Sequence, residues 1–370
     1  MSSIFNALTL PRIPLVPQSL LKAHGVDCII DTRFRSAARL LQRLWLQDNG
    51  IPTGFHVRPT DDGDVVLPLE SLLSPEAACA GRNFISPAVH CFTRRELIMR
   101  EDGACYDEDR LFGNALSSMP LCFNVFAPLA MDLALATTTF KLLLPDFVKQ
   151  VHGIRFETSP GRRETRFLHD GTAFDLALDV VTPDNVRGTV FVEVKYSETM
   201  DGPAARHRER YDEASRQVQL FVDPDSAILR SLALEQLWRE HMLAQLAVDE
   251  GITPRAMFVT IGPRLNRRVQ AALRVYANEL IPGDDLGDDR VRFRANTLED
   301  VIDAIRQAGS AELAKALWSR YCDFERIFHL AMAEYAQPEP AREPVATTPP
   351  VSSAARSRVR RQRTEVVDAE

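Results

Sequence analysis

The chain has 370 residues, of which 45% are hydrophobic and 26% charged, and its formal net charge is −7. These values are typical of a folded protein with one elaborated domain or two domains, and they exclude a largely disordered or collagen-like chain. No apolar run could cross a bilayer, the N-terminus carries no secretory pattern, and the six cysteines form no C-x-x-C pair. We therefore expect a cytoplasmic protein with reduced thiols and no membrane contact.

Residues 1–106 predict an extension that packs on a larger domain. Ser36–Asp48 has apolar side chains at helical spacing, and 51–73 predicts a β-hairpin about the turn formers of 61–64. A short helix-like piece, RRELIMRE at 94–101, closes this region and contains Glu96.

Residues 107–151 predict a helical region that is apolar nearly all round and therefore buried. The polar residues in such a region must find partners, and the two that stand out are Asn124 and Asp132. A first core strand is expected at 152–157, followed by a polar connection to residue 170.

Residues 171–198 predict a β-hairpin. Thr172–Val181 and Val190–Tyr196 are β-rich runs on either side of a segment dense in turn formers, TPDNVRG. The first run alternates Asp175, Ala177 and Asp179 on one face with Phe174, Leu176, Leu178 and Val180 on the other. If the hairpin folds about Asp184, Asp175 lies opposite Glu193, and Lys195 shares the face of Glu193.

Two carboxylates and one ammonium on an apolar patch of sheet are typical of a site for a hard divalent cation. Asp175 and Glu193 would be ligands, the backbone carbonyl of Val194 could add a third oxygen, and Lys195 could position or deprotonate the attacking water. Asp179 is the alternative first ligand, although it would lie nearer the turn, opposite Thr189. The competing interpretation is that E-x-K is a solvated ion pair of little consequence.

The rest of the chain predicts further helices and strands in alternation. They are helices at Ala204–Leu220 and Asp225–Val248, a strand at Ala256–Gly262, a helix at Leu265–Glu279, a strand VRFRA, and two helices over Leu298–Glu334. Residues 336–370 are rich in proline and lack aromatic residues, which predicts a disordered tail. Its basic segment 356–363 is either a loose nucleic-acid tether or a solubilising tail.

The order Asp, then Glu-x-Lys, on two neighbouring strands resembles the signature of the PD-(D/E)XK nuclease superfamily. The residue before Asp175 is Phe174, a departure from the proline of that signature. Longer blocks, among them RLLQRLWLQDNGIPTG, LFGNALSSMPLCFNVFAPLA and FVEVKYSE, are similar to a bacterial family within the superfamily and cover about Ser36–Glu198.

This resemblance implies an α/β restriction-endonuclease-like core, a mixed central sheet flanked by helices, over residues 107–335 with the N-terminal extension attached. It also implies hydrolysis of phosphodiester bonds, most readily in DNA, by water activated by Mg²⁺ or Mn²⁺. Superfamily members often add polar groups from neighbouring helices, and the candidates for such support are Asn124, Glu198, Tyr211 and Gln217. A satisfied core amide for Asn124 and solvated helix positions for the others are the alternatives, and Glu96 is a weaker candidate.

Basic residues flank the hairpin and predict contacts with nucleic acid despite the net negative charge. They are Arg162, Arg163, Arg166, Arg206 and Arg208. A homodimer would allow both strands of a duplex to be cut, but nothing in the sequence shows one. The alternative function is a nuclease-like fold that binds nucleic acid or a protein partner without cutting. A nucleotide enzyme on a Rossmann-type sheet is disfavoured because the chain has no glycine-rich phosphate loop.

Overall fold

A five-stranded mixed sheet forms the core of the part of the chain that the computed structural model describes, which comprises residues 10–60, 63–201, 206–287 and 289–336. The strand order is β3-β4-β5-β6-β7, antiparallel from β3 to β5 and parallel from β5 to β7. The strands are β3 (Gln150–Thr158), β4 (Phe174–Val181), β5 (Arg187–Val194), β6 (Ala256–Gly262) and β7 (Arg292–Thr297). The predicted hairpin, first strand and later strands are all present, with ends shifted by a few residues.

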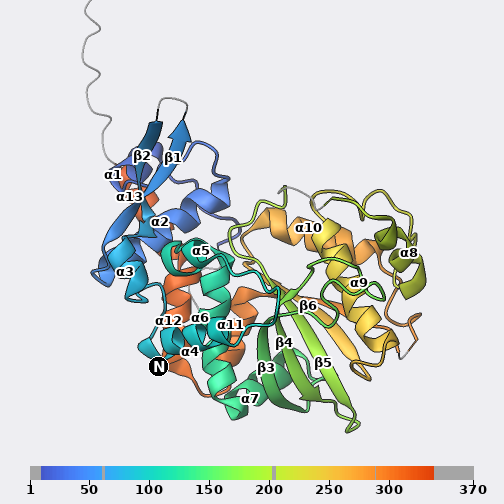
Figure 1. The fold of residues 1–370 in the computed structure, drawn as a ribbon. Coiled ribbons are helices and arrows are strands. Elements are labelled where there is room, and N and C mark those ends of the chain that lie inside the picture. Colours follow the sequence, from blue (N-terminus) through green and yellow to red (C-terminus); the bar gives the residue numbers. More distant parts are fainter. Residues whose placement is uncertain (1–9, 61–62, 202–205, 288, 337–370) are drawn as a thin grey trace, which may run out of the picture. The chain divides into compact units, whose positions relative to one another are not determined.

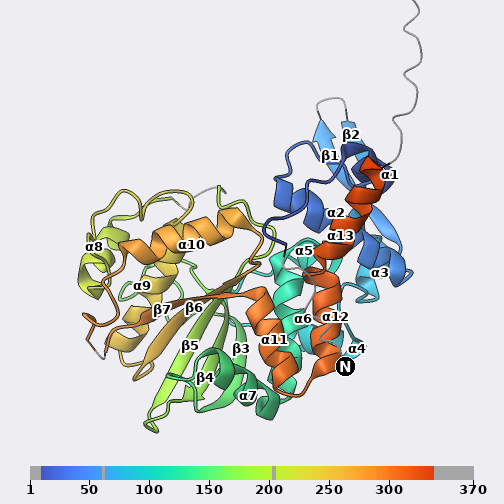
Figure 2. The same cartoon turned by 180° about the vertical axis from the view of Figure 1, so that it is seen from behind.

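Helices cover both faces of this sheet (Figures 1 and 2). One face carries α6 (Ser118–Met131), α7 (Leu133–Leu143), α11 (Leu298–Gln307) and α12 (Ala311–Tyr321), and the other carries α8 (Glu209–Val218), α9 (Glu235–Asp249) and α10 (Arg267–Glu279). Alternation along β4 divides its side chains between them: Leu176 and Leu178 pack with the first group, whereas Ala177 packs with the second. The predicted α/β architecture with a helix-flanked mixed sheet is confirmed.

The N-terminal residues belong to the same apolar core as the sheet. They form α1 (Gln18–Ala23), α2 (Arg33–Asp48), the two-stranded sheet β1 (Thr53–Thr60) and β2 (Gly63–Leu73), α3 (Pro75–Cys79), α4 (Pro87–Ile98) and α5 (Glu108–Gly113). Helix α2 packs on α12 and on α13 (Phe324–Tyr335), with the rings of Phe34 and Phe324 5.4 Å apart. Residues up to Tyr335 form one unit. The boundary at residue 106 stays a prediction, and the predicted disordered tail lies, from residue 337, outside the described residues.

Side-chain caps explain where several helices begin and end. The hydroxyl of Ser86 accepts a hydrogen bond from the Val89 N–H and Pro87 is the first helical residue, so α4 begins seven residues before the RRELIMRE piece assigned to it from sequence. Asp132 separates α6 from α7 and accepts from the N–H groups of Ala134 and Leu135. The sequence predicts that Asp132 must find a polar partner, and that partner is the start of α7, which Asp132 caps.

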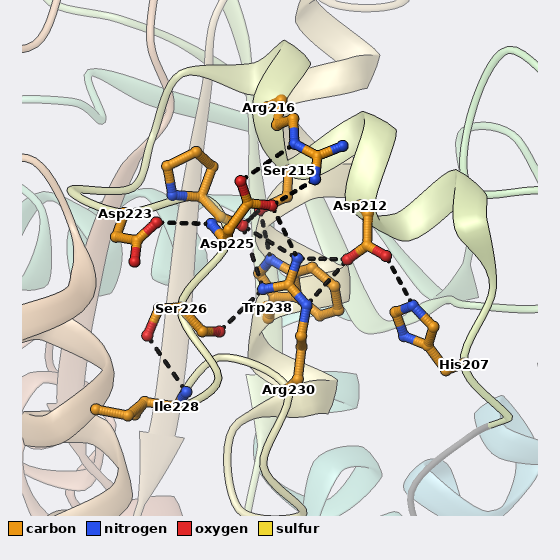
Figure 3. Close-up of polar contacts among 11 residues, drawn as sticks. His207, Asp212, Ser215, Arg216, Asp223, Asp225, Ser226, Ile228, Arg230 and Trp238 are labelled. Atoms are coloured by element: carbon orange, nitrogen blue, oxygen red, sulfur yellow. Dashed lines mark hydrogen bonds and ion pairs between the residues drawn. The ribbon is translucent and has the colours of Figure 1, made fainter.

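The predicted helix at Asp225–Val248 is wrong in its first half, because α9 begins only at Glu235. Figure 3 shows the reason: Arg230 donates to Asp212 and to the carbonyls of Pro224 and Ser226, and its guanidinium lies 4.7 Å from the centre of the Trp238 ring. This network holds 223–234 in turns that carry Ile228 and Leu232 outward, 48% and 57% exposed. The apolar side chains at helical spacing in this segment therefore have no surface to pack against that would favour a helix.

Three helices, not the predicted two, occupy the described residues from Leu298 to Tyr335. The chain turns after α12, where the Asp323 carboxylate accepts a hydrogen bond from the Arg326 N–H and caps α13. Gly309, at φ +104°, provides the turn between α11 and α12.

No single helix among the described residues is long and apolar enough to span a membrane. The pair α6 and α7 meets the length and composition requirement only when taken together, and its two helices are bent by 116°.

His241 in α9 couples the stability of the fold to pH. Its Nε2–H donates to the Val291 carbonyl at 2.8 Å, its Nδ1 accepts from the Tyr276 hydroxyl at 2.9 Å, and burial lowers its pKa to about 4. The unfolded chain takes up this proton near pH 6.5 while the folded chain resists it, so stability falls as the pH falls from 6.5 towards 4.

We expect His241 to remove about 2 kcal/mol of unfolding free energy between pH 7.5 and pH 5. Urea denaturation of the wild type and of His241→Gln at both pH values measures this contribution, because the other titrating groups are common to both chains. The account is wrong if the two proteins lose the same stability over this interval.

Candidate active site

The register of β4 on β5 is the one predicted from a turn about Asp184. Asp179 pairs with Thr189 and Leu176 with Val192, so the next opposed positions are Asp175 and Glu193. Here the regular ladder ends, and Asp175 Oδ2 accepts a hydrogen bond from the Val194 N–H at 2.7 Å. The Asp175 side chain thus binds a backbone group of β5 beside Glu193 and Lys195.

One detail of the predicted alternation is wrong at this point. The Phe174 ring stacks on Phe191 at 4.3 Å and contacts Phe258 at 6.0 Å, on the α9 face, and does not join Leu176 and Leu178. Phe174 lies beyond the last β4–β5 pair, Leu176 with Val192, although it still pairs with Thr158 of β3.

Glu193 and Lys195 form a buried ion pair on the α9 face. Their Oε1 and Nζ atoms are 2.6 Å apart, and the side chains are 6% and 7% exposed. Burial works against the charge on Lys195, but the carboxylates of Glu193, Glu240 and Glu198 outweigh it and raise the pKa of the ammonium. Lys195 therefore keeps its proton.

Gln236 of α9 holds this pair in place. Its Oε1 accepts from Lys195 Nζ at 2.7 Å, and its Nε2 donates to Glu193 Oε1 at 2.8 Å and to Glu240 Oε1 at 2.7 Å. The Gln236 amide thus orients both charged side chains and links them to the carboxylate of Glu240, one helical turn further along α9. Glu240 is fully buried, and its Oε2 has no hydrogen-bond partner among the described residues.

The acidic groups affect one another's proton affinities. Loss of hydration, followed by the nearby Glu193 carboxylate, raises the pKa of Asp175 well above its ordinary range, and the same two causes act on Glu240. Burial raises the pKa of Glu157, at the end of β3, to about 7; Arg162 opposes this and Glu193 adds to it. Glu157 also has a positive φ of 45°, an uncommon backbone conformation for a residue with a side chain.

A cavity of about 390 Å³ opens beside Lys195 and Gln236. Its lining comes from distant parts of the chain: Arg35 from α2, Arg110 and Asn114 around α5, 197–200 after β5, and Glu235 and Arg239 from α9. The N-terminal residues thus form one wall of the space into which the E-x-K lysine projects.

A family model described as the PD-(D/E)XK nuclease superfamily matches residues 29–323, most of the chain. The chain belongs to this superfamily. No curated protein and no solved structure gives a significant match. The superfamily match spans the hairpin, α9 and the arginines of the cavity wall, and it confirms the resemblance seen in the shorter motifs.

The donor set fits the divalent ion that PD-(D/E)XK nucleases typically use. Asp175 and Glu193 offer carboxylate oxygens. The Val194 N–H donates to Asp175 of β4, whereas the next N–H, that of Lys195, donates to the Ile261 carbonyl of β6. Because a peptide carbonyl points away from the N–H that follows it, the Val194 carbonyl also lies on the side of Asp175. The described residues contain no cluster of three or more His, Cys, Asp or Glu side chains arranged to hold a metal. Two carboxylates completed by water and substrate phosphate are sufficient for Mg²⁺.

Of the supporting residues predicted for this PD-(D/E)XK site, only Glu198 lines the cavity with Lys195. Asn124 is a satisfied core amide, with hydrogen bonds to the Asn83 carbonyl, the Tyr321 hydroxyl and the Ile85 N–H. The Tyr211 hydroxyl donates to Asp170, Gln217 accepts from Arg210 on the exposed side of α8, and the exposed Asp179 pairs with Arg155 at 2.9 Å. The structure does not bring these four residues to the site.

The basic residues predicted to contact nucleic acid are mostly engaged within the fold. Arg162 is buried against the carbonyls of Glu157 and Gly171, Arg166 pairs with Glu164 and Glu250, and Arg208 donates to the His169 carbonyl. Arg163 and Arg206 are exposed.

Sequence reasoning missed Gln236, Glu240 and Glu157, together with the arginines of the cavity. The spacing of Gln236 and Glu240 places both on one side of a helix, but the same spacing occurs on solvated helix faces. No signal in the sequence sets them apart.

Proposed function

We propose that this protein is a metal-dependent nuclease that hydrolyses phosphodiester bonds in DNA with Mg²⁺ or Mn²⁺. The observation that carries the proposal is the meeting of Asp175 with the buried Glu193–Lys195 pair at the end of the β4–β5 ladder. Superfamily membership supports the nuclease-like class of activity.

In this mechanism Asp175, Glu193 and the Val194 carbonyl would hold the metal, which would supply Lewis-acid charge and lower the pKa of water. Lys195 would orient the attacking water and offset the charge that develops on the phosphate. Gln236 fixes Glu193 and Lys195 in one geometry before substrate arrives.

The test is cleavage of plasmid, linear duplex and single-stranded DNA with Mg²⁺, Mn²⁺ or EDTA. We expect cutting that needs metal and that Lys195→Ala lowers by about 10²- to 10⁴-fold. Lys149→Ala removes an exposed lysine that binds Asn185 near the hairpin turn, and it should cut as the wild type does.

Absence of cutting on every substrate, together with absence of metal binding, would contradict the proposal. The protein would then be a nuclease-fold binder of nucleic acid or of a protein partner. Cutting that persists in EDTA would contradict the metal-dependent mechanism alone.

A further inference from the structure

The cavity beside Lys195 has the size of a site for one nucleotide unit. Its volume of about 390 Å³ lies at the lower end of the range found for small-molecule pockets. Residues of α2 and α5 line it together with residues of α9, so it is walled on more than one side. A double helix does not fit into a volume of this size.

Cationic side chains outnumber acidic ones in the cavity lining. Four cations, Arg35, Arg110, Lys195 and Arg239, face two acids, Glu198 and Glu235. Asn114, Ser117, Ser197, Thr199 and Gln236 add polar groups, and Leu116, Met200, Leu232 and Ala233 are the apolar part of the lining. This composition favours an anionic, hydrogen-bonding ligand.

Most of these cations are held in place by the fold. Arg35 pairs with Asp31 at 3.0 Å and donates to the Ser197 carbonyl at 3.2 Å, and Arg239 pairs with Glu235 at 2.6 Å. Arg110 differs, because it is exposed and its guanidinium has no ion-pair partner among the described residues. The guanidinium N–H groups of Arg110 can therefore donate to a ligand in the cavity.

The lining contains no Phe, Tyr or Trp among the described residues. Proteins that read single strands through their bases use such rings as stacking platforms. This cavity can instead contact the phosphates of a strand, which are the same in every sequence.

We propose that the cavity receives a single strand of nucleic acid and binds its phosphates through Arg110, beside Lys195. The inference rests on the nuclease function proposed above and narrows its substrate to unpaired segments such as single strands, ends or flaps. A strand enters a space of this size only where it is free of a partner strand.

Binding without cleavage tests this inference separately from the activity. In EDTA, fluorescence anisotropy would compare a 12-nucleotide DNA strand, the same strand as RNA, and the corresponding DNA duplex, at several salt concentrations. We expect each single strand to bind about tenfold more tightly than the duplex, with similar affinities for DNA and RNA because the contacts are to phosphate.

Arg110→Ala should weaken single-strand binding by about tenfold and lower the salt-dependence slope by about 0.7, the loss of one phosphate contact. Arg274→Ala, which removes an exposed arginine of α10 outside the cavity lining, is the matched control and should bind within about twofold of the wild type. Equal affinity for strand and duplex, or equal effects of the two substitutions, would overturn the inference. Failure of cleavage with these binding results intact would count only against the nuclease proposal.

Discussion

Asp175→Asn is expected to lower the rate of metal-dependent cleavage by about 10³-fold or more, because it removes one of the two carboxylates that would hold the metal. An asparagine oxygen can still accept the hydrogen bond from the Val194 N–H, so the end of the β4–β5 ladder is kept. Cleavage rates and calorimetric titration with Mn²⁺, measured on the same preparations, check the expectation.

Stability separates this loss of activity from misfolding. The pKa of Asp175 is raised in the folded protein by burial and by Glu193, so its carboxyl costs the fold stability as the pH rises above the ordinary range of an aspartate. Asparagine has no such cost. Asp175→Asn should therefore be at least as stable as the wild type at pH 8 without metal, while being inactive.

Asp179→Asn is the matched control on the same strand. Asp179 is exposed and pairs with Arg155, and its loss should change the unfolding free energy by no more than about 0.5 kcal/mol and leave cleavage nearly unchanged. If Asp179→Asn were the inactive variant, the first metal ligand would be Asp179, the alternative named from the sequence, and not Asp175.

The sheet and the core of the site follow from local features of the sequence. A turn-rich segment between two β-rich runs sets the hairpin register, and the register opposes Asp175 to Glu193. That reasoning requires only a period of two and a turn centred on Asp184. It fails at Phe174, which lies beyond the last β4–β5 pair and whose ring packs on Phe191, on the α9 face.

The parts of the site that escaped prediction depend on contacts between distant segments. Gln236 reaches Lys195 because the contact of Arg230 with Trp238 holds the turns before α9 and so sets where that helix begins. Such contacts produce no periodic pattern in the sequence. Arg35 and Arg110 reach the cavity only because the N-terminal helices pack on the core. Helix phase and tertiary packing decide both, and neither is local.

Arg320 of α12 joins the N-terminal helices to the core, and its replacement should lower the unfolding free energy far more than that of a surface arginine. The side chain is fully buried and donates to the Gln42 amide oxygen at 3.2 Å and to the carbonyl and side-chain oxygens of Asn83 at 2.7 and 2.5 Å. Its guanidinium lies 4.0 Å from the centre of the Trp45 ring. It thereby joins α12 to α2 and to the loop before α4.

Arg320→Met is expected to lower the unfolding free energy by about 3–5 kcal/mol, because the buried side-chain oxygens of Gln42 and Asn83 lose their donor and the Asn83 carbonyl keeps only Asn124. Arg320→Lys should recover little of this, since an ammonium lacks the planar fork that reaches both Asn83 oxygens. Arg326→Met, which breaks only a surface pair with Asp48, should cost at most about 1 kcal/mol. Urea denaturation of the three variants gives the comparison, and equal losses at 320 and 326 would contradict it.

The consequence extends to the site, because Gln42 also donates to the Tyr196 hydroxyl at 3.0 Å, and Tyr196 follows Lys195 in the chain. A lysine at position 320 that allows folding but loosens Gln42 would loosen the end of β5. We therefore expect Arg320→Lys, at a temperature where it is folded, to cleave DNA more slowly than Arg326→Met. Equal rates would show that the buried network stabilises the fold without positioning Lys195.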